Sequence, residues 1–183
     1  MKTDMTYLDK NNINIIPATL SDYPIIQNMA RFYVYDFSRY CGFISKDWEI
    51  PEDGLFTCFD FKKYFIDSDK KAYLVKLEDK ELVGFVLLDK QATSLNIDWN
   101  IGEFFILAKF QGKGVAGEVA KQIWLKYPGK WEASVIPENK PALAFWRKTI
   151  AAFTNNNYQE EIKTIDYDKA QPKRYIFNFV TNP

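Results

Sequence analysis

The chain contains no histidine. This absence removes the commonest general base, the commonest metal ligand and the Ser–His and Cys–His pairs that activate nucleophiles. Any chemistry must therefore use carboxylates, Tyr, Lys, Ser, water or backbone amides. We expect no metal, because two cysteines without a histidine cannot build an ordinary structural zinc site.

Cysteine is also scarce. Cys41 and Cys58 lie too far apart for a C-x-x-C motif. A disulfide between them is one possibility. Our prediction is two buried free thiols in a reducing compartment.

Neither sign of charge dominates, since Lys plus Arg and Asp plus Glu each number 24. Nucleic-acid-binding proteins usually carry a basic stripe, so we expect no nucleic acid as a partner. The longest apolar run, at 82–88, is far shorter than the roughly 20 residues that cross a bilayer. The first twelve residues lack the hydrophobic stretch of a signal peptide. We therefore expect a cytoplasmic protein without membrane contact.

The chain has material for a substantial core, because 47% of its 183 residues are hydrophobic. This length suits a single domain over 1–183, in which we expect 1–11 to be a flexible N-terminus. Aromatic residues make up 17% of the chain. Most of them would fill a Phe-rich core, and the excess suggests a cleft lined by rings.

Hydrophobic periodicity and turn residues predict alternating elements. Strands are predicted at 11–16, 72–77, 81–88, 99–108, 131–136, 158–165 and 174–180, and helices at about 20–41, 56–66, 115–126 and 140–150. The link at 78–80 has hairpin length, so its flanking strands should be antiparallel neighbours. The predicted fold is α/β (α+β), a mixed and mostly antiparallel sheet of six to seven strands flanked by about four helices.

A glycine cluster follows the strand predicted at 99–108. Gly112 and Gly114 lie in the turn, Gly117 follows closely, and a helix starts near Val115. Helix N-termini have free N–H groups and a positive dipole end, and glycines let the backbone close around an anion. A phosphate or pyrophosphate is the natural ligand of such a corner, with Lys113 adding charge from the rim. A simple tight turn is the alternative.

The same glycines also fit the dinucleotide fingerprint G-x-G-x-x-G. Glu132 then lies near the expected position of a ribose-binding acid, about twenty residues further on. That fingerprint normally opens a parallel sheet, whereas here it follows an antiparallel hairpin late in a short chain. A dinucleotide-dependent oxidoreductase is therefore a weaker alternative.

Three segments together resemble one family. Gln111-Gly112-Lys113-Gly114-Val115-Ala116 resembles the Q/R-x-x-G-x-G/A signature of the GNAT superfamily of N-acetyltransferases. The strand at 104–107 resembles the family's central strand, and 139–146 (NKPALAFW) resembles its N-x-x-A-x-x-F-Y segment. The segments occur in the family's order, and the predicted elements match over nearly the whole chain.

The resemblance implies an acetyl-CoA-dependent N-acetyltransferase that transfers the acetyl group directly to a primary amine of a small molecule or protein. Acetyl-CoA would be the co-substrate, with its pyrophosphate on the backbone amides of 111–116. Its pantetheine would pair with the main chain of Ile106 and Leu107 and bond to Asn139. Its thioester would sit in a gap between 106–108 and 134–136. The implied cofactor-binding residues are Phe105, Ile106, Leu107, Gln111, Gly112, Lys113, Gly114, Val115, Ala116, Asn139, Phe145 and Trp146.

One departure from the family pattern concerns Trp146. The family often has Tyr here, placed to protonate the leaving thiolate. An indole N–H donates a hydrogen bond but does not transfer its proton at neutral pH, so another acid or water must act. Trp146 could instead simply pack on the helix face. This departure keeps open a non-catalytic acyl-CoA-binding or regulatory domain.

The incoming amine needs a base, because an alkylammonium with a pKa of about 10 must lose a proton before it attacks. Glu103 is the first candidate, since a charge in an apolar strand is costly unless it faces a cleft or has a partner. Partial burial would raise its pKa and suit it to the task. The alternative is a solvent-facing or lysine-paired Glu103. Glu132 is the second candidate, and Ser134, where some relatives carry a carboxylate, could only relay a proton through water.

In this family the first helix and the following loop form the acceptor side of the cleft. The implied substrate-binding residues are Tyr33, Tyr35, Tyr40 and Trp48. Such rings could hold an apolar or cationic amine, or could belong to the core. The sequence leaves open the identity of the amine and the choice between monomer and homodimer. It also leaves open a purely structural interaction protein.

Overall fold

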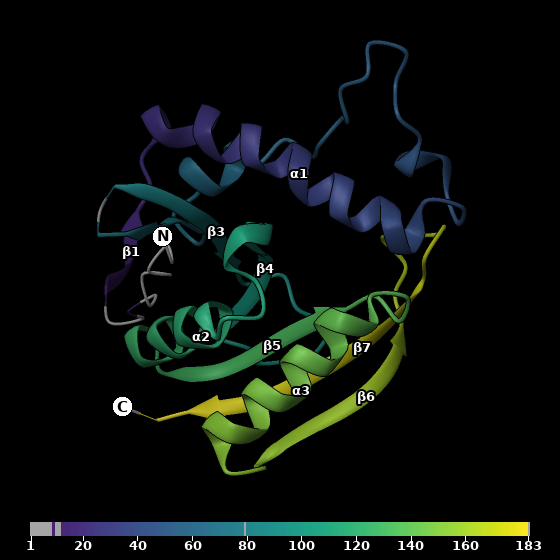
Figure 1. Ribbon diagram of the computed structural model, residues 1–183. Coiled ribbons are helices and arrows are strands. Elements are labelled where there is room, and N and C mark those ends of the chain that lie inside the picture. The colour runs from purple at the N-terminus through teal and green to yellow at the C-terminus, as the bar shows by residue number, and fades with distance from the viewer. Residues whose placement is uncertain (1–8, 10–11, 79, 183) are drawn as a thin grey trace, which may run out of the picture.

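A computed structural model describes residues 9, 12–78 and 80–182 (Figure 1). Apart from Asp9, the segment 1–11 that we expect to be flexible lies outside these residues. The strands are β1 Ile13–Pro17, β2 Lys71–Leu77, β3 Glu81–Asp89, β4 Trp99–Ile106, β5 Gly129–Val135, β6 Tyr158–Thr164 and β7 Lys173–Thr181. The α-helices of this part of the chain are α1 Tyr23–Cys41, α2 Val115–Lys126 and α3 Lys140–Thr154, and short 3-10 turns are η2 Leu20–Asp22, η3 Lys46–Trp48, η4 Lys62–Phe65 and η5 Ala108–Phe110.

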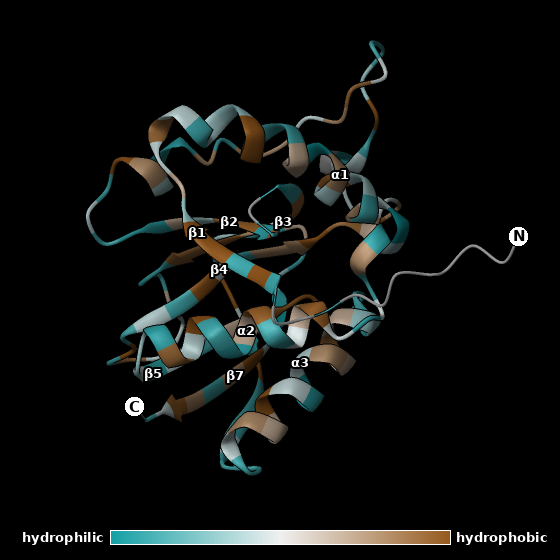
Figure 2. Cartoon of the chain, turned by 60° about the vertical axis from the view of Figure 1, so that its left-hand side comes forward, coloured by the Kyte–Doolittle hydropathy of each residue, from teal (hydrophilic) through white to brown (hydrophobic). Residues whose placement is uncertain are grey.

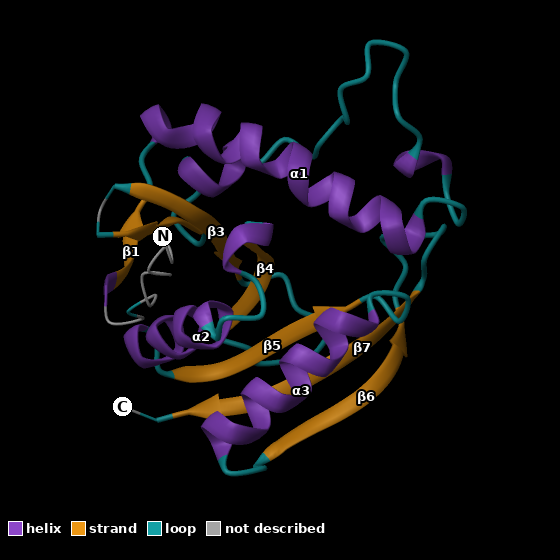
Figure 3. Cartoon of the chain, in the orientation of Figure 1, coloured by secondary structure: helices purple, strands orange, loops and turns teal. Residues whose placement is uncertain are grey.

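The strands form one sheet in the order β1-β2-β3-β4-β5-β7-β6. Only β4 and β5 pair in parallel, and α2 makes the crossover between them; the other neighbours are antiparallel. The predicted mixed, mostly antiparallel fold is therefore confirmed. In Figures 1 and 3, α1 covers one face of the sheet, and α2 and α3 cover the other.

Helix α1 packs on the sheet through an apolar stripe. Ile26, Met29 and Ala30 are buried and recur at helical spacing, as predicted from the sequence. They form one core with Leu74 of β2 and Phe85 of β3. Figure 2 shows brown hydrophobic segments on the sheet beneath the helix. The next turns of the same stripe carry the ring side chains of the cavity described below.

The prediction of a second helix over 56–66 is wrong, because only the 3-10 turn η4 is helical there. The Gln27 side chain of α1 binds this segment instead: its Nε2 donates to Phe59 O at 2.8 Å, and its Oε1 accepts from Phe61 N–H at 3.5 Å. Asp60 also accepts from Lys62 N–H at 2.8 Å. Side chains thus satisfy backbone groups that a helix would have paired internally.

Both cysteines are free thiols, as predicted. Cys41 is buried at the end of α1, whereas Cys58 is only half-buried beside Gln27. Among the described residues, no helix combines the length and apolar character needed to span a bilayer.

Candidate active site

The two central strands separate at the middle of the sheet. Parallel pairing of β4 with β5 ends at Ile101 opposite Ala133, although β4 continues to Ile106 and β5 to Val135. The carboxyl halves of the two strands are therefore not paired with each other. This confirms the gap expected between two diverging strands and places it at the carboxyl ends, where open α/β sheets bind ligands.

A β-bulge shapes the β4 side of this gap. Glu103 lies opposite Leu87, but Ile101 lies opposite Leu88, so Gly102 is an extra residue in β4. Side chains alternate along a regular strand, and one inserted residue reverses that alternation. Asn100 and Glu103, which would otherwise face opposite sides, therefore line the same cavity.

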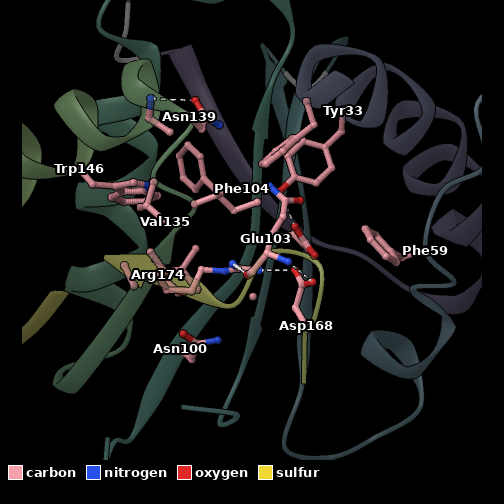
Figure 4. A pocket seen from close by; sticks show the side chains of 18 of the residues that line it. Tyr33, Phe59, Asn100, Glu103, Phe104, Val135, Asn139, Trp146, Asp168 and Arg174 are labelled. Atoms are coloured by element: carbon pink, nitrogen blue, oxygen red, sulfur yellow. Dashed lines mark hydrogen bonds and ion pairs between the residues drawn. The ribbon is translucent and has the colours of Figure 1, made fainter. Parts of the chain in front are cut away.

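The cavity has a volume of about 530 Å³ and lies between α1, the open strand ends and the β6–β7 loop (Figure 4). Its size falls within the range of small-molecule sites, about 300–1,000 Å³. Rings make up much of its wall: Tyr33, Phe37, Trp48, Phe59, Phe104, Trp146 and Tyr167. The predicted ring-lined cleft is therefore present.

Glu103 projects from β4 into this cavity beside Tyr33 of α1 (Figure 4). The Tyr33 hydroxyl donates to Glu103 Oε2 at 2.6 Å. Burial raises the pKa of Glu103 from 4.5 to about 7; the Tyr33 hydrogen bond acts in the opposite direction, and the nearby Asp89 charge adds to the rise. A carboxylate that titrates near neutral pH suits proton exchange with an amine.

Behind Glu103, the buried Asp89 carboxylate has a full set of donors. It accepts from the Tyr64 hydroxyl at 2.5 Å, from Gln91 N–H at 2.9 Å and from Asn100 Nδ2 at 2.9 Å. Burial raises the pKa of Tyr64 well above its usual range, so its hydroxyl stays protonated as the donor. This network fixes the floor of the cavity.

Gly102 leaves room for that network. A Cβ added at Gly102 would lie 2.3 Å from the Tyr64 hydroxyl and 2.7 Å from Asp89 Oδ2. We expect Gly102→Ala to lower the free energy of unfolding by about 1–3 kcal/mol, the usual cost of overpacking. Chemical denaturation checks this value. Gly117→Ala is the control, because its Cβ would meet no atom within 4 Å.

The glycine loop lies at the far end of β4, where α2 begins. Gly112 and Gly114 adopt positive φ values of 71° and 78°, which favour glycine, and residues 111–114 are exposed. The first hydrogen bond into the helix runs from Glu118 N–H to Gly114 O at 3.2 Å. The N–H groups of 115–117 precede it and have no acceptor within the helix.

This corner fits a diphosphate, because its surface is open. A Cβ at Gly112 would meet no heavy atom within 4 Å, so no side chain fills the space next to this glycine. The Lys113 Nζ donates to Lys109 O at 2.7 Å and brings a positive charge to the loop. Gln111 holds the loop to the strand, since its Nε2 donates to Ile106 O at 2.7 Å.

The open edge of β4 offers few main-chain groups. Leu107 N–H donates to Val83 O at 2.8 Å and Leu107 O accepts from Phe110 N–H at 2.8 Å, so both Leu107 groups are engaged. Backbone groups alternate in direction along a strand, so the N–H of Ile106 points toward the gap. Phe105 is expected to bind the cofactor, but its side chain is buried against α1 in the core.

On the other side of the gap, Asn139 caps helix α3. Its Oδ1 accepts from Ala142 N–H at 3.2 Å, and the residue lines the cavity. Trp146 is buried and packs edge-on against Phe104, with ring centroids 5.1 Å apart. Phe145 packs against the same ring at 6.0 Å. Packing therefore accounts for Trp146, although its edge also lines the cavity.

The comparisons with known proteins agree with this geometry. Residues 29–151 match the Acetyltransferase (GNAT) family. The chain belongs to the GNAT family of acetyltransferases. A search of curated proteins found no significant match.

Solved GNAT-like structures share the fold. An acetyltransferase from Thermus thermophilus is similar with a TM-score of 0.64 and 16% identity over 92% of this chain and 97% of that one. Spermidine N-acetyltransferase from Vibrio cholerae, solved with CoA and spermine, has a TM-score of 0.62 and 16% identity over 93% and 96%. At such identities the likeness establishes the fold alone.

Some of the predicted site residues line this cavity and others do not. Tyr33, Trp48, Glu103 and Ser134 line the cavity together. Tyr35 and Tyr40 are not among the residues that line it. Tyr35 lies about 200° around the helix from Tyr33 and is 55% exposed.

Glu132, the second candidate base, lies outside this cavity. The residue is 1% exposed, and its carboxylate accepts from Thr93 N–H at 2.7 Å, Ser94 N–H at 2.9 Å and the Thr93 hydroxyl at 3.1 Å. Glu132 therefore anchors the 90–98 loop, and its carboxylate has no free position for a ribose. This removes the acid on which the dinucleotide alternative depended.

Sequence reasoning missed several cavity residues. Asn100 had a signal, since a lone amide in an apolar strand needs partners, but the bulge that aims it was not foreseen. Phe37 is one helical turn from Tyr33 and could have been found by spacing. Asp168 and Gln171 come from the β6–β7 loop and Arg174 from the start of β7, and this stretch of sequence carries no motif. No cluster of potential metal ligands occurs in the described part of the chain.

Proposed function

We propose that this protein transfers an acetyl group from acetyl-CoA to a primary amine of a small molecule or protein, with Glu103 as the general base. The observation that supports this most strongly is the position of Glu103. Its carboxylate lies in a cavity of small-molecule size, beside the point where β4 and β5 part, and its pKa is about 7. Family membership supports acetyl-CoA as the donor.

Bound acetyl-CoA would supply the activated acetyl group. The N–H groups at the start of α2 would hold its diphosphate, and the Ile106 N–H would orient the arm that reaches the gap. On the α3 side of the gap, Asn139 Nδ2 would donate a further hydrogen bond to the same arm. These contacts would bring the acetyl group into the gap beside Glu103.

The acceptor ammonium then loses two protons in the reaction. Glu103 takes a proton from the ammonium, and the freed nitrogen lone pair attacks the acetyl carbon. This attack forms the N–C bond of the amide. The C–S bond of the thioester then breaks, and the sulfur leaves as the CoA thiolate. The second amine proton leaves the nitrogen for solvent, and the thiolate takes a proton from water, because Trp146 donates hydrogen bonds but no proton at neutral pH.

The acceptor is an amine small enough for the cavity. A polyamine is one candidate, because spermidine N-acetyltransferase is a structural neighbour. A protein lysine or N-terminus is another, since the cavity opens at its ring-lined mouth. The balanced charge of the chain favours neither.

Two measurements test this proposal. Titration calorimetry should detect CoA binding in the micromolar range or tighter, and CoA thiol release should depend on an added amine. No binding at millimolar CoA would overturn the proposal. Binding without thiol release for any amine would support the second candidate, a non-catalytic acyl-CoA-binding domain, which the position of Trp146 favours.

A further inference from the structure

Aromatic rings surround the acceptor half of the cavity, which we define by Tyr33, Phe37, Trp48, Phe59 and Tyr167. Phe37 stacks on Trp48 with a centroid distance of 5.5 Å and an interplanar angle of 9°. Phe59 is 59% exposed and Tyr167 is 69% exposed. Large exposed rings at the mouth of a cavity provide apolar area that a bound ligand would cover.

Charge is sparse in the same cavity. Among the described residues that line it, only Glu103, Asp168 and Arg174 have carboxylic acid or guanidinium side chains. Arg174 and Asp168 form an ion pair at 2.6 Å, and Arg174 also donates to the carbonyls of Gln171 and Lys173. Of the described carboxylates that line the cavity, Glu103 alone has no cationic partner, so it is the lining group that can compensate the charge of one ammonium.

A buried amide adds a neutral acceptor to the wall of the same cavity. Asn100 is 7% exposed, and its Oδ1 has no donor in the described structure. Its orientation is fixed, because Nδ2 must face the Asp89 carboxylate, which accepts at 2.9 Å. Oδ1 therefore requires a donor from a ligand or water, and the cavity that it lines is the place for one.

We propose that the acceptor is a monoamine with an aromatic body, whose nitrogen is held by Glu103 and Asn100 Oδ1 and whose ring lies among Phe37, Trp48 and Phe59. This inference rests on the proposed function and narrows its substrate class. Asn100 does not titrate, so its oxygen can hold the nitrogen both before and after the proton passes to Glu103. A polyamine would bring a second ammonium into the cavity. That ammonium would lose its hydration and find no second free carboxylate on the cavity wall, which disfavours polyamines.

The first test compares 2-phenylethylamine with spermidine as acceptors for the wild-type chain. We expect kcat/KM for 2-phenylethylamine to be higher by about 100-fold. We also expect this amine, and not spermidine, to raise the Tm of the CoA complex, which is a readout independent of turnover. A preference for spermidine would overturn this inference and leave the proposed function intact. If neither amine is acetylated and no other amine releases CoA, both this inference and the proposed function are wrong.

The second test truncates one ring. Phe37→Leu should raise KM for 2-phenylethylamine about tenfold and leave the Kd for CoA unchanged. Tyr35→Leu is the matched control, because it removes a ring from the same helix outside the cavity. Equal effects of the two variants on KM would contradict the proposed ring site.

The third test removes the Asn100 amide, which takes away both Oδ1 and the Nδ2 donor to Asp89. Asn100→Ala should raise KM for the amine by about tenfold or more, with a much smaller change in kcat, because it removes a hydrogen bond to a charged group. A fall in kcat at unchanged KM would contradict a binding role for Asn100. The CoA Kd provides the check that the variant has folded.

Discussion

Gly114→Asp is expected to weaken CoA binding by about 100-fold or more, equivalent to about 2.7 kcal/mol. The substitution places a carboxylate where the diphosphate would lie. Two like unit charges 4 Å apart repel by about 4 kcal/mol at an effective dielectric constant of 20. The positive φ of 78° at Gly114 adds backbone strain for any residue other than glycine. Titration calorimetry measures the change.

Two variants separate the charge from the strain. Gly114→Ala introduces only strain, and we expect it to weaken binding less than the aspartate does. Gly54→Asp introduces the same charge at a similar φ of 76°, in an exposed loop where a Cβ meets nothing within 4 Å. It should leave CoA binding unchanged. Wild-type CoA affinity in Gly114→Asp would show that the diphosphate lies elsewhere.

Local pattern was enough to predict most of the fold. The strand, glycine loop and helix from Trp99 to Lys126 each have a strong signature: a mostly apolar run, glycines where φ is positive, and a helical period. The segment at 56–66 shows the limit. Its ring spacing fits a helix, but Gln27, about thirty positions earlier, binds its backbone, and such a distant contact leaves no trace in local spacing.

Sequence predicted a residue of the candidate site only where a charged side chain lies in an otherwise apolar strand. Glu103 was identified because a charge in an apolar run requires a partner or a cleft, and the structure provides both in Tyr33 and the cavity. Glu132 gave the same signal for a different reason, since its partners are the amides of a loop. Sequence therefore finds buried charge but does not distinguish a reactive carboxylate from an anchoring one. The difference depends on which groups fill the carboxylate's acceptor positions.

Glu103→Gln is expected to reduce kcat/KM by about 10²- to 10³-fold, within the range for loss of a general base. The pH profile should change with it. In the wild type, kcat/KM should rise with pH and level off above about 7, because Glu103 must be ionised to take the proton. In the variant this rise and plateau near pH 7 should disappear. Its kcat/KM should instead keep rising with pH up to the pKa of the free amine, about 10. A retained rise and plateau near pH 7 would assign the base to another group.

Glu132→Gln is the matched control, because it makes the same change in a buried carboxylate one strand away. It should lower Tm by removing an acceptor from the Thr93–Ser94 amides, and it should keep the rise of kcat/KM that levels off above about pH 7.

Glu103→Gln should have the opposite effect on stability. The folded protein raises the pKa of Glu103 from 4.5 to about 7, so it binds the proton more tightly than the unfolded chain does. Stability from this group is present below pH 4.5 and is lost as the pH rises through about 7. The variant should therefore have a higher Tm than the wild type at pH 8 and lose that advantage toward pH 5, which would identify Glu103 as a carboxylate held at the expense of stability.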